Sequence, residues 1–132
     1  LANTTKPLIG PGVVNRAEAE AVVAMARALR GPELARNPAC APFICPITPL
    51  RFPAEVVDAL TVVAQAGLPL EVIANPVMGV TAPYTIAGSV ALGHAEVLAA
   101  AVMAHARSSS AIFWSSVSSS RGARSGASTQ TL

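Results

Sequence analysis

The sequence predicts an α/β fold of parallel βα units that form part, about half, of a (β/α)8 barrel. Short apolar runs begin near residues 6, 42, 68 and 111 and alternate with segments of helical periodicity. The spans between the runs are too long for hairpins and long enough for helical crossovers, so the strands should be parallel. Of the 132 residues, 52% are hydrophobic and 12% are charged, a balance typical of one core-rich domain. Right-handed crossovers permit either an open doubly wound sheet or a partial barrel.

The first predicted strand, residues 6 to 10, is followed by a helix that begins after Asn15. Asn15 can cap this helix, and Glu18 can reach back to complete a capping box. Apolar residues then recur at the spacing of one buried face until Gly31 and Pro32 end the helix. The residues predicted for that face are Val22, Met25, Ala26 and Leu29.

Residues 42 to 47 form the second predicted strand, and residues 54 to 66 form the second helix. The third and fourth predicted strands span residues 69 to 74 and 110 to 114. The inward positions predicted for the second helix are Val56, Val57, Leu60, Val63 and Ala64. We therefore divide the chain into a partial barrel, residues 1 to 114, and a Ser- and Gly-rich tail, residues 115 to 132. Such a composition indicates either a flexible terminus or an active-site loop that lacks its partners.

The longest predicted helix lies within residues 82 to 107, with Thr81 as its cap and Pro83 in its first turn. The loop before it follows a parallel strand, at the end where α/β proteins bind ligands. Gly79 lets this loop turn tightly, although a purely structural loop would favour the same residues. His94 and Glu96 point to different sides of the helix, so they cannot share a metal ion, and a structural role is expected for them.

Composition argues against several functional classes. A net charge of +2 from scattered Lys and Arg predicts no nucleic-acid partner. Residues 85 to 106 are long enough to span a bilayer, but His94, Glu96 and His105 would be costly in hydrocarbon, so no membrane association is expected. Cys40 and Cys45 lack the spacing of a zinc site, which predicts free thiols in a cytoplasmic protein and no metal site.

Five segments of the chain match one known family in order. The strongest is "TAPYTIAGSVALGHAEVLAAAV", and it follows "TKPLIG", "MARALRGPELARNP", "PITPLRF" and "LTVVAQAGLPLEV". Over residues 5 to 106 the sequence resembles the trimethylamine methyltransferase family, the corrinoid-dependent methylamine and quaternary-amine methyltransferases. The match weakens toward the Ser-rich end.

The resemblance implies a (β/α)8 barrel that moves a methyl group from a methylated amine, either trimethylamine or a quaternary amine such as a betaine, to Co(I). The cobalt corrinoid would belong to a partner protein, so no cofactor is expected to bind this chain directly. No catalytic residue is assigned. The expected substrate-binding residues combine the loop with the aromatic residues near strand ends: Asn75, Gly79, Thr81, Tyr84 and Trp114.

Two other functions stay open at this point. A half-barrel could serve as a non-catalytic binding or assembly module, and its uncovered strand edges predict self-association. A doubly wound nucleotide-binding protein is disfavoured, because no G-x-G-x-x-G follows a predicted strand.

Overall fold

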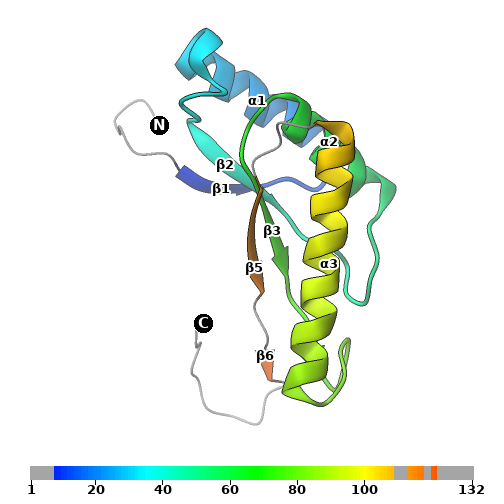
Figure 1. The fold of residues 1–132 in the computed structure, drawn as a ribbon. Helices are drawn as coiled ribbons and strands as arrows, with labels where there is room; N and C mark the ends of the chain where they lie inside the picture. Colours follow the sequence, from blue (N-terminus) through cyan, green and yellow to red (C-terminus); the bar gives the residue numbers. More distant parts are fainter. Residues whose placement is uncertain (1–7, 109–112, 118–119, 122–132) are drawn as a thin grey trace.

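The structure, a computed structural model, describes residues 8–108, 113–117 and 120–121 (Figure 1). Strands and helices alternate along most of this part, as the spacing of apolar runs predicted. The elements are β1 (Leu8–Gly12), α1 (Arg16–Arg30), η1 (Gly31–Glu33), β2 (Cys40–Ile44), α2 (Ala54–Gln65), β3 (Leu70–Ala74), β4 (Val77–Met78), α3 (Ile86–Arg107), β5 (Phe113–Val117) and β6 (Ser120–Arg121). The α/β class is confirmed.

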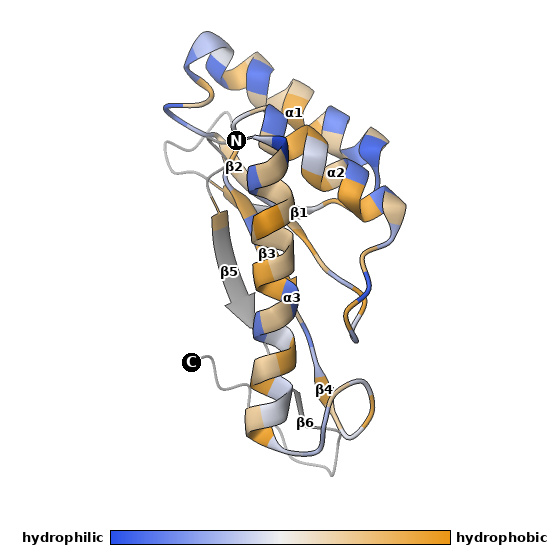
Figure 2. Cartoon of the chain, turned by 45° about the vertical axis from the view of Figure 1, so that its right-hand side comes forward, coloured by the Kyte–Doolittle hydropathy of each residue, from blue (hydrophilic) through white to orange (hydrophobic). Residues whose placement is uncertain are grey.

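The main sheet has four strands in the order β1-β2-β3-β5, and every neighbouring pair is parallel. Each new strand is added on the same side of the previous one. Right-handed crossovers that progress in one direction place their helices on one face of the sheet. The three helices indeed lie together on one face (Figures 1 and 2). The described sheet is therefore singly wound, whereas a doubly wound sheet reverses direction and carries helices on both faces.

Alternate strand residues meet the helices in one core. Cys40 and Ile44 of β2 and Leu70, Val72 and Ala74 of β3 are buried there. The helices contribute a second set: Ala19, Val22, Val23, Ala26, Val56, Ala59, Leu60, Val63, Val97, Ala100 and Ala104. Each large aliphatic side chain buried in this way contributes roughly 1.5–3 kcal/mol. Because side chains alternate along a strand, the remaining strand residues face away from the helices.

Helix α1 begins as predicted but buries a different stripe. The Asn15 side chain accepts a hydrogen bond from the Glu18 N–H at 2.9 Å, and the Glu18 carboxylate accepts one from the Val14 N–H at 3.0 Å. The predicted burial of Met25 and Leu29 is wrong, since these side chains are 56% and 44% exposed. The buried residues are Ala19, Val22, Val23 and Ala26. They have the same spacing as the predicted stripe but include a second alanine, whose small side chain permits close packing.

Three further details differ from prediction: the end of the second strand, one buried position of the second helix and the end of the fourth strand. Strand β2 ends at Ile44, because Ile47 instead forms an antiparallel bridge to Arg51 within a turn. In α2, Val57 is only partly buried and Ala59 occupies a core position. Strand β5 ends at Val117, whereas the fourth strand was predicted to end at residue 114, and the short strand β6 was not predicted. The predicted strand positions 6, 7 and 110 to 112 and most of the tail lie outside the described residues.

The start of α3 was also predicted wrongly. The helix begins at Ile86, and Thr85 is its cap, with the Thr85 hydroxyl accepting from the Gly88 N–H at 3.1 Å. The Val77 carbonyl accepts from the N–H groups of residues 80, 81 and 82 and so closes a separate turn over the predicted first helical residues. Ser89 donates its hydroxyl to the Pro83 carbonyl at 2.8 Å, which fixes how the chain enters the helix.

Helix α3 has one side on the sheet and a partly apolar outer side. Its buried residues are Ser89, Gly93, Glu96, Val97, Ala100 and Ala104. The outer side exposes Ile86, Val90, Leu98 and Val102, and hydrophobic colour covers much of the helix in Figure 2. By length and composition alone, α3 is the one helix among the described residues that could cross a membrane, a test that core helices of soluble proteins also pass.

Candidate functional site

The loop between β3 and α3 carries four of the five predicted site residues. Asn75 is exposed directly after β3. Gly79 has a φ of +76°, which confirms that this position needs a left-handed backbone, and its N–H donates to the Ala82 carbonyl at 2.9 Å. Thr81 is not a helix cap: its hydroxyl accepts from the Val77 N–H at 3.0 Å and braces the turn.

Tyr84 is 87% exposed, and its ring lies beside Gly79. A Cβ placed on Gly79 would be 3.1 Å from Cδ2 of Tyr84. The structure thus brings Gly79 and Tyr84 together, while the Thr81 hydroxyl bonds to Val77. The side chain of Trp114, the fifth predicted residue, lies outside the part of the chain whose side chains are described.

Substitution of Gly79 tests whether this loop takes part in the reaction. Gly79→Ala should be strained by its positive φ and should displace the Tyr84 ring, and it should lower the rate of the methyl transfer that the family resemblance implies. Gly31→Ala is the matched control, because Gly31 also has a positive φ, +55°, but nothing lies within 4 Å of its added Cβ. Each change should destabilise the protein by about 1 kcal/mol. Equal rates for the two variants in a methyl-transfer assay would remove the loop from the site.

A second candidate region lies on the helix-free face of the sheet. Phe43 of β2 and Glu71 of β3 are direct register partners, and Glu71 is in turn paired with the backbone of Trp114 in β5. Neither Phe43 nor Glu71 belongs to the core beneath the helices, because the alternate residues Ile44, Leu70 and Val72 fill that side. Register partners in a parallel sheet project to the same face, so a phenyl ring and a carboxylate lie side by side.

Glycines in β1 make room for this aromatic ring. Gly12 pairs with Phe43, and a Cβ built on Gly12 would be only 2.8 Å from Cζ of the ring. A Cβ on Gly10 would be 3.8 Å from Cε1. The ring therefore lies across β1, and the "GPG" stretch of the sequence is explained by this close approach.

Glu71 is 9% exposed, an unusual position for a carboxylate in a sheet strand. Glu71 was not among the predicted site residues, although the alternation of its strand points to it. Leu70, Val72 and Ala74 alternate as the core-facing residues of "LEVIA", which leaves Glu71 on the opposite face. A buried carboxylate outside the core is rare enough to mark Glu71 as a candidate binding residue.

The pKa of the Cys45 thiol, directly after β2, depends on this carboxylate. Desolvation raises the pKa of Cys45, and the negative charge of Glu71 raises that pKa further. Cys45 is an exposed free cysteine, so reagents can reach it, whereas Cys40 is buried. Both cysteines are free thiols, as predicted.

Alkylation kinetics give a direct prediction. A raised pKa means less thiolate at a given pH, so Cys45 should react with iodoacetamide more slowly than a free cysteine near pH 8. Glu71→Gln removes the negative charge, lowers the pKa of Cys45 and should speed the reaction. The exposed Glu55→Gln, on the helix side, serves as the control. An unchanged pH–rate profile in Glu71→Gln would show that the two groups do not interact.

The carboxyl end of β2 continues into a strained turn that α3 holds in place. Leu50 has a φ of +52°, which is unfavourable for a leucine. Its N–H donates to Oε1 of Glu96 at 2.8 Å, and the Thr48 hydroxyl donates to Oε2 at 3.0 Å. Glu96 is fully buried while His94 is exposed, which confirms the structural role expected for Glu96. This turn lies at the same sheet edge as the loop after β3, because carboxyl ends of parallel strands meet there.

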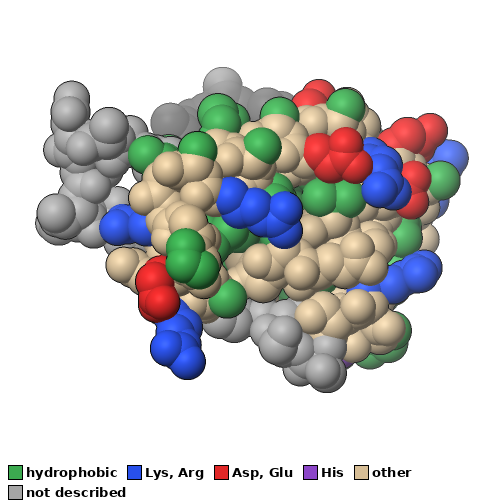
Figure 3. Space-filling view, turned by 90° about the horizontal axis from the view of Figure 1, so that it is seen from above, with side chains coloured by type: hydrophobic (Ala, Val, Ile, Leu, Met, Phe, Trp, Pro, Cys, Tyr) green, Lys and Arg blue, Asp and Glu red, His purple; other side chains and the backbone are tan. Residues whose placement is uncertain are grey.

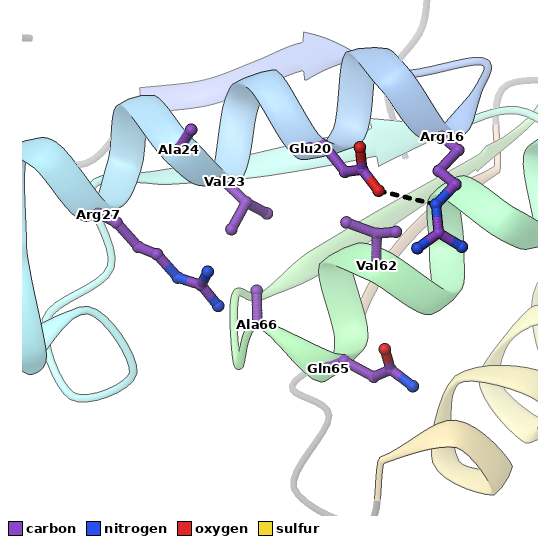
Figure 4. A pocket seen from close by; sticks show the side chains of 8 residues that line it. All are labelled: Arg16, Glu20, Val23, Ala24, Arg27, Val62, Gln65 and Ala66. Atoms are coloured by element: carbon purple, nitrogen blue, oxygen red, sulfur yellow. Dashed lines mark hydrogen bonds and ion pairs between the residues drawn. The ribbon is translucent and has the colours of Figure 1, made fainter.

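A shallow groove of about 250 Å³ separates α1 from α2 (Figure 4). It is lined by Arg16, Glu20, Val23, Ala24, Arg27, Val62, Gln65 and Ala66. Arg16 and Glu20 form an exposed ion pair at 2.7 Å along one wall. Since the groove lies in the helical layer, away from the strand ends, its position does not favour a catalytic role.

Charges on the described surface are mixed. In Figure 3, basic side chains lie next to acidic ones on the face shown. Among the described residues, no group of three or more His, Cys, Asp and Glu side chains is arranged to hold a metal ion. The site that the fold assembles is thus an aromatic ring and a carboxylate on the helix-free face, level with the carboxyl end of β2.

Comparison with known proteins adds the family. The family model "Trimethylamine methyltransferase (MTTB)" matches residues 1–131. A curated relative, trimethylamine methyltransferase MttB of Desulfitobacterium hafniense (strain DSM 10664 / DCB-2), is 30% identical over 111 residues. The match covers 83% of this chain but only 22% of the relative, so the chain spans about a fifth of that protein's length. The match across nearly the whole chain places it in the trimethylamine methyltransferase family.

Proposed function

We propose that the protein containing this chain transfers a methyl group from a methylated amine to the Co(I) of a corrinoid held by a separate protein. The observation that carries this proposal is the family match over residues 1–131. The substrate would be trimethylamine or a quaternary amine such as a betaine. A non-catalytic binding module built on the same half-barrel is the alternative.

We further propose that the described sheet is part of a (β/α)8 barrel. The order β1-β2-β3-β5, the parallel pairing and the placement of all three helices on one face support this reading. If further strands continued in the same direction, the sheet would close with its helix-free face inside. Phe43 and Glu71 would then face the barrel interior, and the loops after β2 and β3 would rim its active-site end.

In the proposed reaction the protein forms no covalent bond to the substrate. Co(I) supplies an electron pair, the new Co–C bond forms as the N–C bond breaks, and the amine leaves with the electron pair of the N–C bond. The chain's contribution is to hold the ammonium group in line with its acceptor and to keep it cationic until transfer. We propose that Asn75, Gly79, Thr81, Tyr84 and Trp114 contribute to the walls of the substrate site.

The proposal also covers the cellular location of the protein and its association with other molecules. A cytoplasmic protein is proposed, with no nucleic-acid or membrane partner. Self-association of the isolated chain is also proposed, and the exposed Ile86, Val90, Leu98 and Val102 on α3 support it.

The direct test is a methyl-transfer assay. The full-length protein would be mixed with a corrinoid protein reduced to Co(I) and with a panel of mono-, di-, tri- and tetramethylated amines. We expect the absorbance of methyl-Co(III) to appear with at least one tertiary or quaternary amine. Association with the corrinoid protein without methylation by any amine would favour the non-catalytic module instead.

A further inference from the structure

We propose that Phe43 and Glu71 together form the binding site for the methylated ammonium group of the substrate. The inference rests on the proposed function for the class of ligand, but the site itself is built from residues that the sequence motifs did not select. It assigns the ammonium group to the helix-free face of the sheet.

The two residues lie next to each other in the sheet. Phe43 and Glu71 are register partners on neighbouring parallel strands, so their side chains leave the same face at adjacent points. Phe43 is the penultimate residue of β2, close to the carboxyl end at which barrel enzymes place their sites. Glu71 is the second residue of β3 and lies level with Phe43 across the sheet.

The two side chains also have the chemistry that suits this ligand. A methylated ammonium group presents an apolar surface with a delocalised positive charge, and it binds well against an aromatic ring. A carboxylate beside that ring supplies the opposite charge. Glu71 is 9% exposed and its charge reaches Cys45, so an electrostatic field exists on this face.

Strand β1 also fits closely around the ring. The distal edge of the Phe43 ring lies against the backbone of Gly10 and Gly12, where no side chain intervenes. This close contact with β1 holds the ring in one orientation. A rigid aromatic face next to a fixed carboxylate can recognise an ammonium group without needing a large conformational change.

Binding of tetramethylammonium to the full-length protein tests the site, with tert-butyl alcohol as the uncharged probe of similar shape. Calorimetry should show that Glu71→Gln weakens tetramethylammonium about tenfold, and that it leaves tert-butyl alcohol unchanged. Phe43→Leu should weaken tetramethylammonium several-fold, and Phe43→Tyr should restore it. Glu55→Gln, an exposed carboxylate on α2, is the matched control and should bind as wild type does.

Wild-type affinity for tetramethylammonium in Glu71→Gln would overturn the proposal, as would a wild-type protein that does not bind this cation. If Glu71→Gln failed to fold by circular dichroism, the contrast between Phe43→Leu and Phe43→Tyr would decide in the same way. Methyl transfer measured in parallel separates the two claims. Cation binding that depends on Glu71 without any methyl transfer would contradict the proposed function and support the site. If Glu71→Gln transferred methyl groups and bound the cation normally, the proposed function would be supported and the site at Glu71 would be contradicted.

Discussion

Replacement of Glu96 by alanine is expected to lower the free energy of unfolding by about 3 kcal/mol. The fully buried carboxylate accepts hydrogen bonds from the Leu50 N–H and the Thr48 hydroxyl. Alanine would leave both donors unpaired and would open a cavity under α3. It would also release Leu50, whose φ of +52° persists only because its surroundings hold it.

Urea denaturation of the protein measures this effect. Glu96→Gln keeps one carbonyl acceptor and should lose only about 1 kcal/mol. The exposed neighbour His94→Ala should change stability by less than about 0.5 kcal/mol and serves as the control. A denaturation midpoint for Glu96→Ala equal to that of His94→Ala would show that the turn after β2 is not held by this carboxylate.

Substitution of Gly12 by alanine is expected to destabilise the protein by about 1–3 kcal/mol and to reduce methyl transfer at the same time. The added Cβ would lie 2.8 Å from Cζ of the Phe43 ring, closer than a Cβ approaches another heavy atom, and 3.1 Å from Cε2, which is also tight. Either the ring swings away from β1 or the two strands separate. Both responses disturb the face on which the carboxylate of Glu71 lies.

A double-mutant cycle isolates the cause. In a Phe43→Leu background the ring is absent, so Gly12→Ala should cost much less than it does in the wild type. The two changes should then be non-additive by at least about 1 kcal/mol in thermal or urea unfolding. Strict additivity would mean that Gly12 is required for a reason other than the Phe43 ring.

The parallel βα pattern could be predicted from the sequence because it depends on spacing. Apolar runs separated by helix-length spans leave few topologies, and the helix cap at Asn15 is a local signal that the structure confirms. The start of α3 could not be predicted in the same way. Thr81 and Thr85 are both plausible caps. The hydrogen-bonded turn that the Val77 carbonyl closes over residues 80 to 82 decides in favour of Thr85.

The site was harder to predict than the fold. Glycine and threonine after a strand marked the loop at residues 75 to 81, since turn chemistry is local. Glu71 and Phe43 come from segments far apart in sequence, and their neighbourhood depends on the register of β2 with β3. The buried face of α1 was also hard to predict, because two sets of apolar residues have the same helical spacing. The set with two alanines is buried, since it packs against α2 and the sheet.

A crystal structure of the full-length protein tests the central claim most directly. We predict that β1, β2, β3 and β5 are four consecutive strands of a closed parallel barrel, with Phe43 and Glu71 facing its interior. The opposite result, a layer of helices packed against the face that carries Phe43 and Glu71, would make the sheet doubly wound. That finding would contradict both the barrel and the site assigned to its interior.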